Sequence, residues 1–159
     1  MDYSSLKNDY IQAMRRYAST VNVVSATHNG VKQAMTATSV ASLSLDPPSI
    51  LVSINTAASI HQILAKDRDF CINVLSNTQK EIAEICSKNE EEDNRFKLGN
   101  WSDNKEIPFS LDAQSNLFCR CFDVFKQNTH SVFFGEVFSV INNESIGPLL
   151  YFDGDYLNK

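Results

Sequence analysis

Residues 31–55, VKQAMTATSVASLSLDPPSILVSIN, decide the fold. The pair Asn29-Gly30 before them is a strong turn signal, so we expect a β-hairpin whose first strand is the run TVNVVSAT at 20–27. The second strand is predicted to be long, over 31–45. Asp46-Pro47-Pro48 ends it, because proline gives no amide hydrogen to a sheet and fixes its own backbone angle.

Further strands and short helices are predicted along the rest of the chain. Apolar residues alternate in the strands and recur every three or four positions in the helices. Six or seven strands with few helices predict a mainly β chain folded as a closed or nearly closed antiparallel barrel. A doubly wound parallel sheet would need a helix after nearly every strand. The expected strands are 49–55, 69–76, 112–126, 130–141 and 148–152, and the expected helices are 4–18, 57–67 and 78–88.

Two segments lie outside this barrel pattern. Residues 1–18 are predicted to hold an N-terminal helix with a stripe of apolar residues on one side. Residues 87–108 are polar and charged and are predicted to be a long surface excursion; a solvated loop and a lid over a ligand are both open readings. A chain of 159 residues is expected to form one domain. The stripe consists of Leu6, Tyr10, Met14 and Tyr17.

Composition excludes several classes of protein. Hydrophobic residues make up 43% and charged residues 21%, as in ordinary globular proteins, and a net charge of −5 argues against nucleic-acid binding. No segment approaches the roughly 20 apolar residues of a membrane span, and the first residues do not resemble a secretory signal. A cytoplasmic protein that binds neither nucleic acid nor membrane is therefore expected.

The cysteines and glycines also lack the spacings of known sites. The four cysteines form no C-x-x-C pair and have no histidine at zinc-ligand spacing, so we expect buried, reduced thiols and no metal. The five glycines build neither G-x-G-x-x-G nor a P-loop. A nicotinamide dinucleotide, if one is used, must then be held without a Rossmann domain.

The segment MTATSVAS, residues 35–42, is a candidate ligand site. On a strand, Thr36 and Thr38 face one way, with Val40 in the same series, while Ala37 and Ser39 face the other. Small side chains let a flat ligand approach the backbone, and hydroxyl and amide groups supply hydrogen bonds to it. A threonine-rich edge strand with no ligand is the alternative, because threonine favours strands.

The segment SINTAASIH, residues 53–61, is a candidate phosphate site. A strand is expected to end at Asn55, and a helix to begin near Ala57 with Asn55 or Thr56 as its cap. The amides of a helix N-terminus can bind phosphate, and Ser59 adds a hydroxyl. Simple capping without a ligand is the alternative.

Four stretches together resemble the short-chain flavin reductases, the reductase components of two-component flavin monooxygenases. They are QAMTATSVASLSLDPPSILVSINTAASIHQIL, FCINVLSNTQKEIA, THSVFFGEV and PLLYFDGDY, and the likeness runs from about Tyr17 to Tyr156. The resemblance implies an FMN-binding split β-barrel, antiparallel and of Greek-key type, that forms a homodimer with a flavin near the subunit interface.

The resemblance also implies roles for particular residues. His130 corresponds to a histidine implicated in nicotinamide binding, and the region from Tyr151 to Tyr156 borders the site. Relatives commonly carry Gly-Asp before that histidine, where this chain has Asn128-Thr129. That difference affects the expectation of nicotinamide use more than that of flavin binding. Thr36, Ala37, Thr38 and Ser39 are expected against the isoalloxazine and ribityl chain, Ser53, Ile54, Asn55 and Ser59 near the ribityl and phosphate groups, and Tyr156 at the border.

The implied activity is reduction of FMN or FAD by NADH or NADPH, which bind transiently, followed by release of reduced flavin to a partner monooxygenase. No catalytic side chain is expected, because the flavin itself accepts the hydride. Three alternatives remain at this point: a flavoredoxin-like protein that retains its FMN and transfers electrons, a non-catalytic flavin-binding protein, and an oxidase of the pyridoxamine phosphate type.

Overall fold

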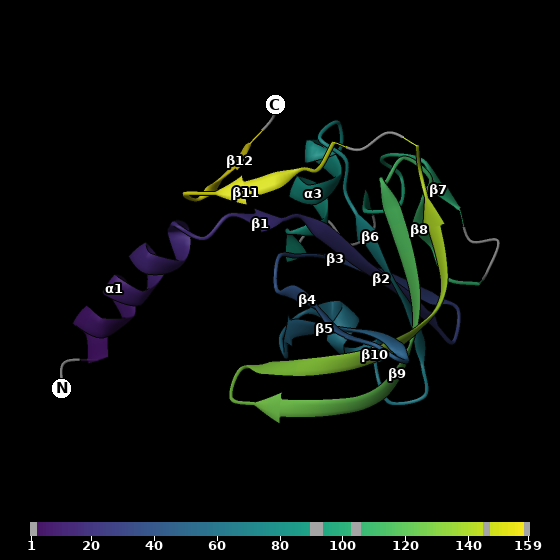
Figure 1. Cartoon of the computed structure of the whole chain (residues 1–159), viewed down its shortest axis with the longest axis horizontal. Helices are drawn as coiled ribbons and strands as arrows, with labels where there is room; N and C mark the ends of the chain where they lie inside the picture. Colours follow the sequence, from purple (N-terminus) through teal and green to yellow (C-terminus); the bar gives the residue numbers. More distant parts are fainter. Residues whose placement is uncertain (1–2, 90–93, 103–105, 145–146, 158–159) are drawn as a thin grey trace.

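The fold is built on one antiparallel sheet of seven strands in the order β3-β2-β6-β9-β10-β5-β4 (Figure 1). The computed structural model describes residues 3–89, 94–102, 106–144 and 147–157. The prediction of a mainly β chain with an antiparallel barrel is confirmed. The seven strands are β2 Asn22–His28, β3 Val31–Ala37, β4 Val40–Leu45, β5 Pro48–Asn55, β6 Asp69–Val74, β9 Ser115–Gln127 and β10 His130–Asn142.

The predicted single strand over 31–45 is wrong, because it is two strands on opposite edges of the sheet. β3 pairs with β2 through the Asn29-Gly30 hairpin, whereas β4 pairs with β5. The chain leaves one edge and joins the other at Thr38 and Ser39, where the Ser39 carbonyl accepts a hydrogen bond from the Ser53 amide (3.0 Å). The seven strands therefore curl into a barrel whose two edges are joined by this short link.

The barrel interior is packed with apolar side chains from most strands and from α2. Phe70 and Phe133 are buried in it, and Gly135 lies against Phe70. A Cβ atom at Gly135 would lie 2.6 Å from Phe70 Cζ and 2.9 Å from Cys119 Cβ, so only glycine fits there. The interior cluster comprises Val24, Ala26, Ala37, Ile50, Val52, Ile54, Ala58, Ile60, Leu64, Phe70, Ile72, Cys119, Cys121 and Phe133.

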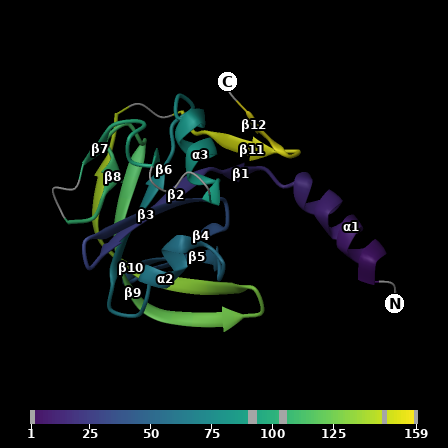
Figure 2. The ribbon, with the colours of Figure 1, turned by 180° about the vertical axis from the view of Figure 1, so that it is seen from behind.

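A second cluster lies between the outer face of β2 and β3, the helix α3 (Lys80–Cys86) and a small sheet. That sheet joins β1 (Ser19–Thr20), β11 (Leu150–Phe152) and β12 (Asp155–Leu157) in the order β1-β11-β12. Figures 1 and 2 show α3 and this sheet on the same side of the barrel. The cluster consists of Val21, Val23, Ala34, Leu75, Ile82, Ala83, Cys86 and Leu149.

The remaining predictions are mostly correct in place and wrong at their ends. The helix expected over 57–67 is α2 (Ser59–Ile63), which ends at Leu64 because that residue turns to an extended conformation. The strand expected from 112 begins at Ser115, after a turn. The strand expected over 148–152 is β11, and β12 was not predicted. All four cysteines are buried thiols, as expected.

The segment 87–108 is less exposed than its composition indicates. Arg95 and Ile107 are buried, and β7 (Trp101–Ser102) pairs with β8 (Phe109–Ser110). Parts of the expected excursion, 90–93 and 103–105, lie outside the described residues. The segment thus contributes side chains to the interior as well as to the surface.

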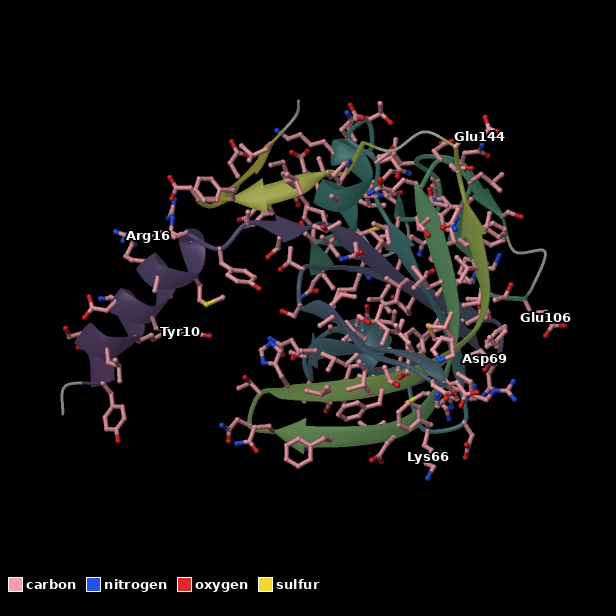
Figure 3. All side chains as sticks on the ribbon, viewed as in Figure 1. Tyr10, Arg16, Lys66, Asp69, Glu106 and Glu144 are labelled. Carbon is pink, nitrogen blue, oxygen red and sulfur yellow. The ribbon has the colours of Figure 1, made fainter. Side chains whose placement is uncertain are left out.

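The N-terminal helix α1 (Tyr3–Arg15) extends away from the barrel and buries none of its residues (Figures 1 and 2). Tyr10 is 63% exposed and stands on this arm apart from the barrel (Figure 3). Arg15 ties the end of the helix to the β11–β12 turn, since its Nε donates to Asp153 Oδ1 (3.0 Å) and its carbonyl accepts from the Asp153 amide (2.8 Å). None of the described helices has the length and hydropathy required to span a membrane.

Candidate functional site

A cleft of about 830 Å³ opens between the end of β3, the turn after β5, the end of α3 and the β11–β12 hairpin. This volume is in the range of sites for cofactor-sized ligands, roughly 300–1,000 Å³. Its walls therefore come from segments that are far apart in the sequence. It is lined by Met35, Thr36, Thr38, Asn55, Ala57, Ala58, Glu84, Cys86, Ser87, Lys88, Asn89, Tyr151, Gly154 and Tyr156.

The wall formed by the end of β3 and the link after it follows the predicted alternation in part. Thr36 and Thr38 line the cleft and Ala37 is buried in the barrel interior, but Met35 lines the cleft as well. The Thr36 hydroxyl donates to the carbonyl of Ala83 on α3 (2.6 Å), so it braces the wall and keeps only its acceptor capacity for a ligand. Ser39 is exposed and is not among the lining residues.

The turn after β5 brings only part of its predicted set into the cleft. Asn55 lines it, and its side-chain oxygen accepts from the Ala57 amide (2.9 Å) within the turn. The expectation that Asn55 or Thr56 caps a helix beginning near Ala57 is wrong, because α2 begins at Ser59 and its N-cap residue is Ala58, with no side-chain cap. Ile54 is fully buried in the barrel, and Ser53 lies on the strand behind. Ser59 begins α2 behind Ala57 and Ala58.

Behind this turn lies a buried polar cluster that the sequence did not predict. The Arg95 guanidinium is 2% exposed and donates to Gln33 Oε1 (3.2 Å), Ser59 Oγ (3.1 Å) and the Ala34 and Lys88 carbonyls (2.8 and 2.7 Å). Ser59 Oγ donates to Gln33 Oε1 (2.8 Å). Three walls of the cleft are therefore tied to one cation.

The opposite wall is aromatic and largely uncharged. Tyr151 and Tyr156 form an edge-to-face pair with ring centroids 5.2 Å apart, and the Lys80 ammonium lies 5.8 Å from the centre of the Tyr156 ring. Burial raises the pKa of the Tyr156 phenol, and burial raises the pKa of the Cys86 thiol to about 12. Both groups are protonated at neutral pH, and Cys86 is no nucleophile.

His130 lies at the tip of the β9–β10 hairpin and is not among the lining residues of the cleft. It pairs across the sheet with Asn55, which does line the cleft, and Thr56 donates from its amide to the Thr129 carbonyl (2.9 Å). Its Nδ1 lies 3.0 Å from Thr129 Oγ1. The imidazole is thus exposed, on the strand next to Asn55.

The set of lining groups suits a neutral aromatic ligand with hydrogen-bonding edges and an anionic end. Hydroxyl, amide and phenol groups make up half of the lining residues. Lys88 supplies a cation, and the carboxylate of Glu84, which also lines the cleft, lies 3.7 Å from the Lys80 ammonium. The flavin fits this donor set in size and chemistry. Within the described ranges, no group of three or more His, Cys, Asp or Glu side chains could hold a metal ion.

Comparison with known proteins gives the class of this barrel and its cleft. The family described as "Flavin reductase like domain" matches residues 14–158. The chain therefore belongs to the flavin reductase-like domain family.

Individual relatives agree along nearly the whole chain. The reductase component of an FADH(2)-dependent resorcinol hydroxylase of Rhizobium sp. is 34% identical over 90% of this chain and 82% of its own. An NADH:riboflavin 5'-phosphate oxidoreductase of Streptomyces pristinaespiralis is 32% identical over 91% and 83%. The flavin reductase of styrene monooxygenase from Pseudomonas putida S12 superposes with a TM-score of 0.85, at 26% identity, over 95% and 97%.

Of the residues expected from the sequence, Thr36, Thr38, Asn55 and Tyr156 meet in one cleft, whereas Ala37, Ser39, Ser53, Ile54, Ser59 and His130 do not line it. The largest omission is Arg95. It follows an acidic run in a polar segment, where an arginine is normally solvated, and no local pattern distinguishes a buried one.

Proposed function

We propose that this chain is a flavin reductase that binds FMN or FAD in the cleft, oxidises NADH or NADPH, and releases reduced flavin to a partner monooxygenase. The observation that carries the proposal is that residues from separate segments of the chain line one cleft. Thr36 and Asn55, which local sequence patterns and the resemblance both indicate, line the same cleft as Tyr156, which only the resemblance indicates. The cleft suits a flavin in size, and the chain belongs to a family of flavin reductases.

The protein's part in the reaction is to bind and to orient. A flavin held in the cleft would supply the redox chemistry, as the acceptor of hydride from the nicotinamide. Thr38 and Asn55 offer hydrogen bonds to its polar edges, and Tyr151 and Tyr156 offer an apolar face that excludes water. No acid or base of the chain is required, in agreement with the protonated Cys86 and Tyr156.

We propose that His130 contacts the nicotinamide. Its exposed place on the strand next to Asn55 supports this role because a donor molecule stacked on the flavin would approach from the open side. His130→Ala should raise the KM for NADH several-fold and leave the dissociation constant of the flavin unchanged. The matched control is His28→Ala, at the distant Asn29-Gly30 turn; equal effects of both variants would contradict the role.

We also propose that the chain is a homodimer with α1 in the interface. An isolated helix of 13 residues is marginal in water, and α1 has no buried residue in the single chain. A hollow between α1 and the β11–β12 hairpin shares Thr38, Tyr151 and Gly154 with the cleft. A second copy seated on α1 would therefore reach the flavin site. We place the protein, as one domain over 1–159, in the cytoplasm, where buried reduced thiols persist.

The decisive experiment is titration of the purified protein with FMN and FAD, followed by NADH and NADPH, with the visible spectrum recorded. We expect flavin binding and oxidation of at least one nicotinamide. Ala57→Trp, which fills the cleft, should weaken flavin binding at least about tenfold, whereas Gln62→Trp on the exposed side of α2 should not. Absence of flavin-dependent NADH and NADPH oxidation would refute the proposal; a tightly held flavin with slow NADH oxidation would indicate an electron-transfer protein instead.

A further inference from the structure

The β11–β12 hairpin is anchored in the core at its base and is exposed at its tip. At the base, Leu149 is fully buried; its amide donates to the Leu75 carbonyl (3.0 Å), and its carbonyl accepts from the Val21 amide (2.9 Å). Beyond the base, β12 lies at the edge of the small sheet, and residues 152–155 at the turn are exposed. The tip of the hairpin can therefore move while the core stays packed.

The same hairpin forms the aromatic wall of the cleft. Tyr151 and Tyr156 lie directly opposite each other on β11 and β12, and their rings pack edge to face. Both line the cleft, together with Gly154 of the turn. Because the strand pairing and the ring contact join the two tyrosines, they follow any movement of the hairpin together. The position of the tip therefore determines whether this side of the cleft is closed.

Arg15, the last residue of α1, holds the tip through hydrogen bonds to one residue. Its Nε donates to Asp153 Oδ1 (3.0 Å), its Nη2 donates to the Asp153 carbonyl (2.7 Å), and its own carbonyl accepts from the Asp153 amide (2.8 Å). The guanidinium also lies against Gly154, where a Cβ atom would come within 2.8 Å of Nη2. We call this set of contacts the Arg15 clamp. Figure 1 shows the turn of the hairpin beside the C-terminal end of α1.

The Arg15 clamp is a contact of limited strength. The side chains of Arg15 and Asp153 are 46% and 71% exposed. Water and salt screen an ion pair at this exposure, so it stabilises the closed position of the hairpin only modestly. Segments that move when a ligand binds or leaves are held by contacts of this kind, because stronger contacts would keep them fixed.

We infer that Arg15 is a positioning residue of the cleft: the Arg15 clamp keeps the Tyr151–Tyr156 wall closed over a bound flavin and thereby sets the rate at which the flavin leaves. Arg15 acts through the hairpin and is not among the residues that line the cleft. The inference rests on the proposed function and identifies the part of the cleft that opens. A wall held by a weak contact suits a reductase that must first retain its flavin and then release it to another protein.

The test measures the rate constant for dissociation of FMN. The FMN complex is diluted in a stopped-flow instrument, and flavin fluorescence is followed. Arg15→Ala should raise the rate constant about threefold, the size of effect expected from an exposed ion pair with its hydrogen bonds. The matched control is Arg16→Ala, which removes an exposed arginine at the same end of α1 (Figure 3) and should leave the rate constant unchanged.

Salt gives an independent measurement on the same two proteins. A concentration of about 0.5 M NaCl weakens the ion pair where it is present, so it should raise the rate constant more in wild type than in Arg15→Ala. An effect of salt on the phosphate of FMN is common to both proteins and cancels in the comparison. If Arg15 only secured α1, this difference between the proteins would not arise.

A second variant changes the other member of the ion pair. Asp153 has a φ of +50°, which asparagine also tolerates, so Asp153→Asn removes the charge and keeps the turn. It should raise the rate constant less than Arg15→Ala does, because the hydrogen bonds to the main chain of this residue remain. The double variant should be no faster than Arg15→Ala alone, as expected for two residues in one contact.

Three results would overturn the inference and leave Arg15 as a tether of α1 only. They are a wild-type rate constant in Arg15→Ala, an equal effect of salt on the two proteins, and effects that multiply in the double variant. In each of these cases the wild type still binds FMN, and the proposed function stands. Absence of FMN binding by the wild type refutes the proposed function together with the inference.

Discussion

The barrel interior and the helix α1 contain similar apolar side chains, which are buried in the barrel and exposed on the helix. Phe70 and Phe133 are enclosed by residues of the same chain, whereas Leu6, Tyr10 and Met14 on α1 are exposed. Each region follows its own periodicity, two in the strands and about 3.6 in the helix. The difference teaches that an amphipathic pattern predicts an apolar face that needs a packing partner. The pattern does not indicate whether that partner belongs to the same chain or to another molecule.

The largest expected effect is a loss of stability on substitution in the barrel interior. Phe70→Ala should lower the free energy of unfolding by about 3–5 kcal/mol, because it leaves a cavity among fully buried neighbours. Tyr10→Ala, its counterpart on α1, should change it by less than about 0.5 kcal/mol in dilute solution. Urea unfolding followed by circular dichroism measures both, and similar losses would remove the distinction between the regions.

The next effect is on assembly. Replacing Leu6, Tyr10 and Met14 together by Ser removes the apolar stripe of α1 and should convert the proposed dimer to a monomer at micromolar concentration. The mass would halve in light scattering after size-exclusion chromatography, and the β spectrum of the barrel would be retained. A variant that keeps the wild-type mass would place the interface elsewhere.

A smaller effect is expected where the two regions are joined. Arg15→Ala removes the ion pair with Asp153 and the hydrogen bond from the Arg15 guanidinium to the Asp153 carbonyl, both at the surface, and should cost less than about 1 kcal/mol. Its consequence should be local, with faster amide exchange in α1 and in the β11–β12 turn. The neighbouring Arg16→Ala is the matched control, and exchange that is equally fast in both variants would deny Arg15 its tethering role.

The smallest effect concerns pH. Burial, with a lesser contribution from Lys126, lowers the pKa of His61, which packs edge-on against Phe133 and hydrogen-bonds Ser131. Because the unfolded chain then binds the proton more readily, this contribution to stability is present above about pH 6.5 and is lost as the pH falls below it. The urea midpoint should fall less between pH 7.5 and 5.5 in His61→Gln than in wild type; an identical fall would contradict the assignment.

The features that could be predicted from the sequence depend on short stretches of residues or on pairs of neighbouring residues. Asn29-Gly30 gives the hairpin because it supplies two residues that tolerate positive φ, which are +50° and +77° here. The break at Thr38 and Ser39 has no proline or glycine to mark it, because it arises from the two strands having different partners. Thr36 and Thr38 could be placed on one face by alternation alone.

The site was predictable only where it follows such alternation. Thr36, Thr38 and Asn55 could be selected, whereas the burial of Arg95 depends on contacts with Gln33 and Ser59 that no short window contains. Tyr156 came from resemblance, and the edge-to-face partner Tyr151 was expected only as part of a bordering region. Charged residues in polar segments are normally solvated, so the burial of Arg95 can be recognised only from the three-dimensional structure.

The strand order also bears on how the chain folds. β2 pairs with β6, β6 with β9, and β5 with β10 from the other half of the chain, so three of the six strand pairings in the seven-stranded sheet join residues that are distant in sequence. In topologies of this kind the chain loses conformational entropy by closing long loops before the stabilising contacts form. Such barrels commonly fold in milliseconds to seconds. The hairpins β2–β3 and β9–β10 can form early, whereas the link at Thr38 and Ser39 can take its place only after β5 has found β10. We therefore expect the walls of the cleft, the proposed flavin site, to be among the last parts of the molecule to be assembled.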